Sequence, residues 1–131
     1  MERRIESAAP ADLIFAYTRS QALADGVLVD VSGIAAEAGI RFPVAVTAAL
    51  WGEYIQVPND DALHCQSVEG RLWDTLTLFR TVARNTGGDQ LFFRVSYVMA
   101  GRKMVTPVLK AVCGPGDSGE PVITIMKQDE D

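Results

Sequence analysis

Apolar and polar residues alternate most regularly in the last third of the chain. Every odd position of Leu91–Met99 is apolar, whereas Arg94 and Ser96 take even positions. This period of two is typical of a strand that buries one face. Together with a similar pattern in Met104–Cys113 and the apolar run Val122–Met126, it predicts three consecutive antiparallel strands.

The turn between the first two strands predicts how they pair. A loop through Ala100–Arg102, with Val95 opposite Pro107, places both apolar sets on one face. A shift by two residues would set Arg94 opposite Lys110, and like charges in that position cost stability. Because proline has no N–H to donate, we expect the second strand to lie at an edge or to be broken at Pro107.

Helical spacing predicts the layer that covers this sheet. Ser67 is a suitable cap for a helix over Val68–Asn85, in which apolar residues recur every three or four positions. Trp73 and Leu78 lie off the centre of that stripe, and we expect both to widen the buried face. Val122–Met126 is apolar on both sides, so we expect it inside the sheet with cover on each face.

The first half of the chain predicts shorter elements. We expect a helix over Pro10–Ala24 and a strand over Val27–Val31. Ser32 is a suitable cap for a helix over Gly33–Ala38, and a further helix is expected over Pro43–Ile55. The predicted fold class is therefore α+β, with an antiparallel sheet of three or four strands, including the C-terminal meander, covered by helices.

Two of these helices resemble a DNA-binding motif. Ile34–Ile40 is similar to the first helix and turn of bacterial helix-turn-helix repressors. The following Val44–Trp51 offers no Arg, Lys, Gln or Asn to read base edges. A helix-turn-helix-like regulator stays open as an alternative function, although the net charge of −5 makes a nucleic-acid partner an unfavoured interpretation.

Composition indicates one domain in a reducing compartment. The 131 residues, of which 48% are hydrophobic, suffice for a single core over residues 10–127, flanked by a mobile arm at residues 1–9 and an acidic tail at residues 128–131. No apolar run approaches the roughly 20 residues of a membrane span. The two distant cysteines form no disulfide framework, so we expect a cytoplasmic protein without a membrane partner.

Candidate catalytic groups are few. Asp117 and Glu120 lie in the glycine-rich segment before the last strand, where they are either paired carboxylates or the capping residues of a turn. Asp60, Asp61, His64 and Cys65 are chemically able to hold a metal, but their spacing matches no familiar site. We therefore predict no catalytic residue, metal or cofactor, and keep a small metal-dependent hydrolase using Asp117, Glu120 or His64 as an alternative.

Two basic and two aromatic residues are candidates for contact with a partner. Arg94 and Lys110 lie on the less apolar face of the predicted sheet and are suited to an anionic partner. Trp51 and Trp73 would mark a partner or homodimer interface if they were exposed. With Asp117 and Glu120, these are the six candidate interaction residues.

Four segments resemble a known family. They are Ala24–Val31, Phe42–Thr47 with Trp51, Gly70–Asp74, and Cys113–Asp117 continuing through Ile125. The resemblance, over residues 21–127, is to small uncharacterised bacterial proteins often carried on plasmids and other mobile elements. It implies a bacterial cytoplasmic protein but supplies no catalytic residues. We hypothesise a non-enzymatic interaction protein by which a mobile element binds and modulates a host or defence protein.

Overall fold

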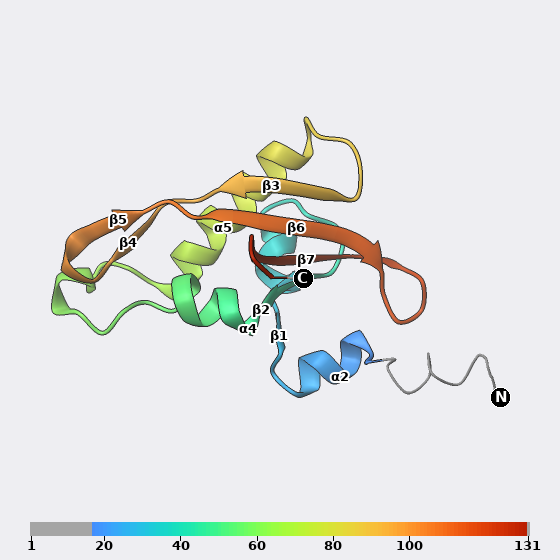
Figure 1. Ribbon diagram of the computed structural model, residues 1–131, viewed down its shortest axis with the longest axis horizontal. Helices are drawn as coiled ribbons and strands as arrows, with labels where there is room; N and C mark the ends of the chain where they lie inside the picture. The colour runs from blue at the N-terminus through green and yellow to red at the C-terminus, as the bar shows by residue number, and fades with distance from the viewer. Residues whose placement is uncertain (1–16, 131) are drawn as a thin grey trace.

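The computed structural model describes residues 17–130 (Figure 1). The strands are β1 (Leu28–Asp30), β2 (Val44–Thr47), β3 (Gln90–Arg94), β4 (Tyr97–Met99), β5 (Lys103–Val105), β6 (Val108–Pro115) and β7 (Pro121–Lys127). The helices are α2 (Arg19–Ala24), α3 (Ser32–Glu37), α4 (Ala48–Leu50) and α5 (Val68–Ala83), with short irregular helices η1 (Trp51–Ile55), η2 (Asp61–Leu63) and η3 (Ala100–Arg102).

The main sheet is mixed, not antiparallel. Five strands lie in the order β1-β2-β7-β6-β3, and β4 and β5 form a separate two-stranded sheet. The one parallel pair joins β2 to β7, with Val44 opposite Ile123. The α+β class is confirmed, but the expectation of a purely antiparallel sheet is wrong because β2 inserts beside the last strand.

The predicted register of the C-terminal meander is confirmed. Phe93 lies opposite Leu109 in β3–β6, and Tyr97 opposite Val105 in β4–β5. Across the gap between these ladders, the hydroxyls of Ser96 and Thr106 lie 2.9 Å apart. The two ladders therefore keep one register and form a long ribbon that projects from the body (Figure 1).

Pro107 marks the break in this ribbon. It lies between β5 and β6, where its carbonyl accepts a 3.4 Å hydrogen bond from the N–H of Val95. The predicted local break is confirmed, and β6 lies inside the sheet with β3 and β7 on its two sides. The tight turn at the tip places Gly101 and Arg102 at φ values of 74° and 60°, in the left-handed region that favours glycine.

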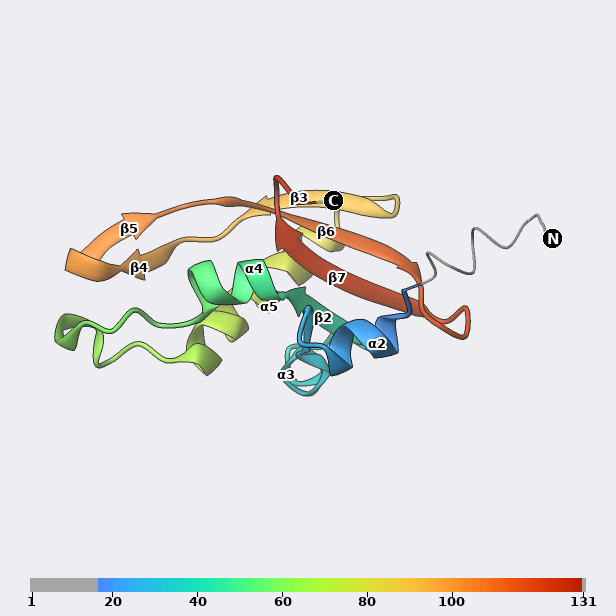
Figure 2. The ribbon, with the colours of Figure 1, turned by 60° about the horizontal axis from the view of Figure 1, so that its bottom comes forward.

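Helix α5 covers the core face of the sheet, together with α3 (Figure 2). The Ser67 side chain accepts from the N–H of Gly70 and caps α5 as predicted. Phe79 meets Phe93 of β3 with ring centroids 5.8 Å apart. The largest fully buried side chains of the core are Leu50, Ile55, Leu76, Leu109, Ile125, Val44, Val46, Val95 and Thr75.

Trp73 and Leu78 are not part of that core. Their exposed fractions are 44% and 40%, so the expectation that both widen the buried face is wrong. Each residue of a helix is turned by about 100° from the one before it. Viewed down the axis of α5, Trp73 therefore lies about 120° from Phe79 in one direction, and Leu78 about 100° in the other. The buried stripe is therefore narrower than these two positions require.

The helix predicted over Pro43–Ile55 is also wrong in its first half. Val44–Thr47 is the buried strand β2, and Thr47 caps the helical turn that follows it. A short apolar run of this kind reads equally well as a buried strand or a helix segment. Because the second helix of the helix-turn-helix resemblance does not form, these residues do not build that motif.

Two helix starts differ from the sequence predictions. The helix expected from Pro10 begins, within the described residues, at Arg19, with Thr18 as its cap. The part before residue 17 lies outside the described residues. Ser32 is the first residue of α3 and does not cap it. Its hydroxyl instead accepts from the N–H of Val44 and donates to Asp30, which ties β1 to β2.

The second face of the sheet is only partly covered. Helix α2 and the C-terminal turn lie over β2 and β7, and the Glu130 carboxylate accepts from Thr47 and from the N–H of Lys127. Toward β3, none of the helices of residues 17–130 covers this face, and Phe92 is 48% exposed. Within residues 17–130, no helix has both the length and the apolar character that crossing a membrane requires.

Candidate functional site

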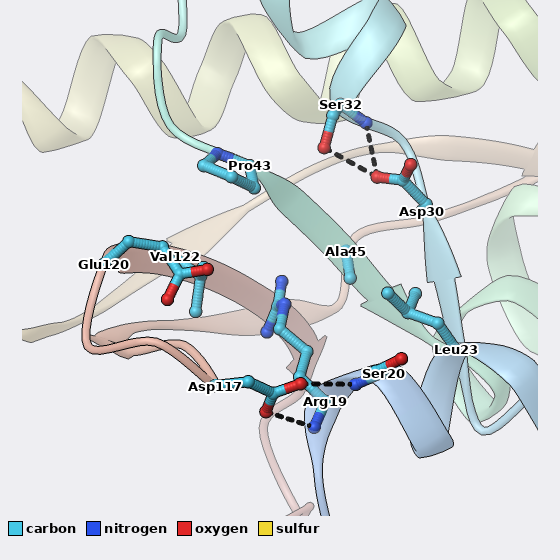
Figure 3. Close-up of a pocket in the computed structure, with 10 residues that line it drawn as sticks. All are labelled: Arg19, Ser20, Leu23, Asp30, Ser32, Pro43, Ala45, Asp117, Glu120 and Val122. Carbon is cyan, nitrogen blue, oxygen red and sulfur yellow. Dashed lines mark hydrogen bonds between the residues drawn. The ribbon is translucent and has the colours of Figure 1, made fainter.

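A polar pocket of about 260 Å³ brings together Asp117 and Glu120, two of the six candidate residues (Figure 3). Its walls are α2, the ends of β1 and β2, and the loop between β6 and β7. Three of the four segments on which the family resemblance rests contribute to it, through Asp30, Pro43 and Val122 among others. This pocket is therefore the first candidate for a catalytic or binding site.

Asp117 acts here as a cap from a distant part of the chain. Its two carboxylate oxygens accept from the backbone N–H groups of Arg19 and Ser20, at 2.8 and 2.9 Å (Figure 3). These are the first residues of α2, whose N–H groups have no partner within the helix. The sequence predicted that Asp117 caps a turn in its own loop, whereas the element it caps is α2, nearly one hundred residues upstream.

Arg19 occupies the middle of the pocket. Its guanidinium donates to the Thr124 hydroxyl at 2.8 Å and to the Ile123 carbonyl at 2.9 Å. Burial lowers the pKa of Arg19, and the nearby carboxylates of Asp30, Asp117 and Glu120 oppose that shift. The pocket thus already contains the cation that its acidic rim would attract.

The other two carboxylates also have partners. Asp30 accepts from both the hydroxyl and the N–H of Ser32, at 2.6 and 3.1 Å. Glu120 accepts from the N–H of Ser118 at 2.9 Å, inside its own loop. The arrangement holds α2 and the β6–β7 loop against the sheet, a structural role.

His64 lies far from this pocket. It follows η2, which is tied to the tip of the β4–β5 hairpin through a 2.9 Å bond from Gly101 N–H to Asp60. That hairpin and the β6–β7 loop lie at opposite ends of the molecule (Figure 1). The described part of the chain contains no group of three His, Cys, Asp or Glu side chains placed to hold a metal.

The remaining candidates are scattered. Lys110 donates to the Glu130 carbonyl, and Arg94 is exposed on the same sheet face. Trp51 begins η1 and is half-buried against the core. Trp73 is exposed on α5. The structure therefore brings Asp117 and Glu120 into one pocket and places Arg94 diagonally from Lys110 on one face of the sheet.

A buried polar cluster joins the ribbon to α5. Arg71 donates to the carbonyls of Tyr54 and Val98, and its Nε has no partner within the described residues. Burial lowers its pKa. Because the Thr75 hydroxyl donates to the Arg71 carbonyl, the Tyr97 hydroxyl must donate to Thr75, 2.7 Å away. This cluster is closed to solvent and fixes the base of the ribbon.

An apolar groove lies on the other side of α5. Two adjoining hollows of about 170 and 340 Å³ share the side chains of Phe42, Phe79, Ala83 and Ile123. Phe42 comes from the loop after α3 and is 47% exposed. We call this surface, formed by the two hollows together, the Phe42 groove. Its walls are mainly apolar side chains, unlike those of the polar pocket.

Arginines border the Phe42 groove. Arg41, Arg80 and Arg84 all line its larger hollow. The Arg80 side chain lies over Gly39, whose φ of 92° and lack of a Cβ leave room for it, since an added Cβ would lie 2.8 Å from Nε. Trp73 is seven and eleven residues before the two α5 arginines, so it lies on the same stripe of the helix. The groove thus combines apolar walls with a basic border, and Trp73 lies further along the same stripe of α5.

Sequence reasoning missed this groove. The four-residue spacing of Arg80 and Arg84, on one stripe with Trp73, is visible in the sequence as a basic face on α5. Phe42 could not be joined to that face, because its neighbour Ile123 belongs to a strand whose partner, β2, was predicted to be a helix.

Comparison with known proteins gives one match. Residues 5–131 match the model of a family described as "Family of unknown function (DUF6573)". The chain matches none of the curated proteins and no solved structure.

Proposed function

The chain belongs to this family of unknown function, and from its surfaces we propose that it works by binding another protein and not by catalysis. The observation that supports the proposal is the Phe42 groove. A large aromatic side chain is held half in solvent beside an apolar hollow. Aromatic and arginine side chains that border such a hollow are the residue types enriched at protein contact sites.

The charge around the groove indicates the partner's chemistry. The chain as a whole carries −5, yet this surface has three arginines at its border. A partner segment that places an apolar side chain beside Phe42 and carboxylates near Arg41, Arg80 or Arg84 would satisfy both features. The proposed partner segment is therefore apolar with acidic flanks.

The resemblance to plasmid-carried bacterial proteins extends the proposal. A protein encoded on a mobile element meets host and defence proteins inside the recipient cell. We include in the proposal that the partner is one of these, bound in the cytoplasm and modulated by binding. Turnover of any substrate that depended on Asp117 or Glu120 would contradict the non-enzymatic part.

The test is capture of a partner by matched variants. The tagged full chain, Phe42→Glu and Met104→Glu are each used to retain proteins from a bacterial lysate, and retained proteins, nucleic acid and metal are quantified. Met104 is 62% exposed on β5, so it controls for a new charge on an exposed apolar residue. Circular dichroism checks that all three chains are folded.

The proposal expects one protein retained in near-equal amount by the wild-type chain and Met104→Glu, and reduced at least tenfold with Phe42→Glu. Such a factor corresponds to a loss of about 1.4 kcal/mol. Added salt should weaken capture, because arginine–carboxylate pairs at a surface are screened. Equal retention by Phe42→Glu, or retained metal or DNA without protein, would overturn it.

A further inference from the structure

Among residues 17–130, β3 is the last strand of the main sheet, and its outer edge pairs with no other strand. Asp89 O accepts from Cys113 N–H at 2.8 Å and Val95 N–H donates to Pro107 O at 3.4 Å. These bonds show that the odd-numbered residues of β3, Leu91 and Phe93, form the hydrogen-bonded pairs with β6. In an antiparallel ladder the groups of intervening residues point away, so Gln90, Phe92 and Arg94 direct their N–H and C=O groups outward.

The outward groups have no partner among the described residues. The sheet order ends at β3, and no hydrogen bond from residues 17–130 reaches the backbone of Gln90, Phe92 or Arg94 on that side. Proteins usually shorten, charge or cover such an edge, because it is a template for another strand. Here the edge strand has five residues and one charge, Arg94.

Apolar side chains flank the edge on both faces. Phe92 points to the bare face of the sheet and is 48% exposed. On the opposite face, Leu78 of α5 is 40% exposed. Leu78 follows Arg71 by seven residues on one stripe of α5, and Arg71 bonds to Val98 of β4. Leu78 therefore lies on the ribbon side of the helix.

The sequence of β3 is complementary to itself. Antiparallel pairing of two copies about Phe92 sets Phe92 opposite Phe92 of the second copy, and Gln90 opposite Arg94. No two like charges face each other, and an aromatic pair lies at the centre. The Phe92–Phe92 pair and the two Gln90–Arg94 pairs carry outward backbone groups, so each exchanges two hydrogen bonds. The Leu91–Phe93 pairs between them are the non-hydrogen-bonded pairs of the new ladder.

We propose that β3 is a homodimer interface, in which the β3 strands of two copies pair about a two-fold axis at Phe92 and join their sheets into one. The interface is isologous, as two-fold symmetry requires. Its core is Phe92 on one face and Leu78 on the other. A contact of one short strand per copy lies at the small end of interface sizes, so we expect a dissociation constant of about 1–100 µM.

The first test is sedimentation equilibrium of the full chain from about 1 µM to about 500 µM, a range that brackets the expected constant. The wild-type chain should change from monomer to dimer. Phe92→Lys should remain monomeric over the range, because it places two ammonium groups together at the axis. Met104→Lys, which adds the same charge to β5, should dimerise like the wild type.

A covalent test locates the axis. In a Cys65→Ser background, which removes an exposed thiol, Phe92→Cys should be joined to a second copy by a short bis-maleimide, since Cα atoms of such a pair lie about 5.5 Å apart. Met104→Cys should not. A wild-type chain that stays monomeric, a dimer that persists in Phe92→Lys, or no preference for linkage at position 92 would each overturn the proposal.

The proposed homodimer and the proposed partner protein can be tested separately. The smaller hollow of the Phe42 groove includes Gln90 and Leu91 of β3 on the core face of the sheet. Phe92 points to the opposite face, so the two substitutions, at Phe42 and at Phe92, alter different surfaces. Phe42→Glu should dimerise normally, and Phe92→Lys should still retain the partner protein. Failure of one inference therefore does not carry over to the other.

Discussion

Single side chains in this protein have structural roles that their residue types do not reveal. Asp117, a candidate for acid–base chemistry by type, caps a helix. Arg71, a charged residue in a helix, is 3% exposed and bonds two carbonyls. In both cases the partner atoms are backbone groups from remote segments, so the role depends on tertiary structure.

Tyr97 gives a prediction on pH. Burial raises the pKa of Tyr97 to about 12, from an ordinary value of 10.0. Because the folded state holds the proton of Tyr97 more tightly than the unfolded state does, this shift adds to the free energy of unfolding. The added stability is complete below pH 10 and is lost as the pH rises toward 12. The full shift corresponds to about 2–3 kcal/mol of unfolding free energy.

The variant Tyr97→Phe isolates that contribution. Below pH 10 it should be less stable than the wild type by about 1 kcal/mol, because one buried hydrogen bond is lost. By about pH 11.5 the difference should vanish or reverse, since phenylalanine does not ionise. Urea unfolding of both chains at the two ends of the range measures this, and a pH-independent difference would contradict the assignment.

At the scale of elements, the cap of α2 is testable. Asp117→Ala should lower the unfolding free energy by about 1 kcal/mol, the usual cost of a lost cap. Amide exchange at Arg19 and Ser20 should become faster while α5 is unaffected. Asp129→Ala removes the same charge from an exposed residue of the C-terminal turn and should leave α2 protected. Unchanged exchange in Asp117→Ala would disprove the capping role.

The tie between η2 and the ribbon tip has its own signature. Hydrogen bonds from the N–H groups of Gly101 and Ala62 lower the pKa of Asp60. The amide proton shift of Gly101 should therefore titrate with a midpoint below the ordinary Asp value of 3.8. Asp60→Asn should abolish that titration and Asp61→Asn should not. A Gly101 amide shift that titrates in the same way in Asp60→Asn as in the wild type would contradict the hydrogen bond between Gly101 and Asp60.

Elements were predictable where their pattern was local. The register of the β3–β6 and β4–β5 ribbon followed from alternation and from separating Arg94 and Lys110. The strand Val44–Thr47 was not predictable, because it is apolar on both sides and its parallel partner β7 lies far along the chain. A short run without alternation carries no periodic signal to separate strand from helix.

For the whole molecule, the candidate residues were predictable only in part. Asp117 and Glu120 are close in sequence and do share a pocket. The Phe42 groove needs a loop residue, one face of α5 and a buried strand to meet. That meeting depends on the mixed sheet, which places β7 beside β2 and so brings Ile123 below Phe42. Long-range strand order, absent from any local pattern, decides the site.

The molecule has two surfaces to which a binding partner is assigned. One is basic and apolar and is proposed to receive a partner protein. The other is the β3 edge, proposed to receive a second copy of the chain. Together they describe a small dimer that presents two equivalent Phe42 grooves, and such a dimer would bind a repeated partner more tightly than one copy does.

The most direct test of protein binding is hydrogen–deuterium exchange on the captured complex, compared with the free protein at equal concentration. The account predicts slowed exchange in residues 39–43 and 79–86, which form the Phe42 groove, with no change at the Asp117 loop. The equal concentration keeps any β3 pairing the same in both samples. Protection at the Asp117 loop, or none at residues 39–43, would contradict it.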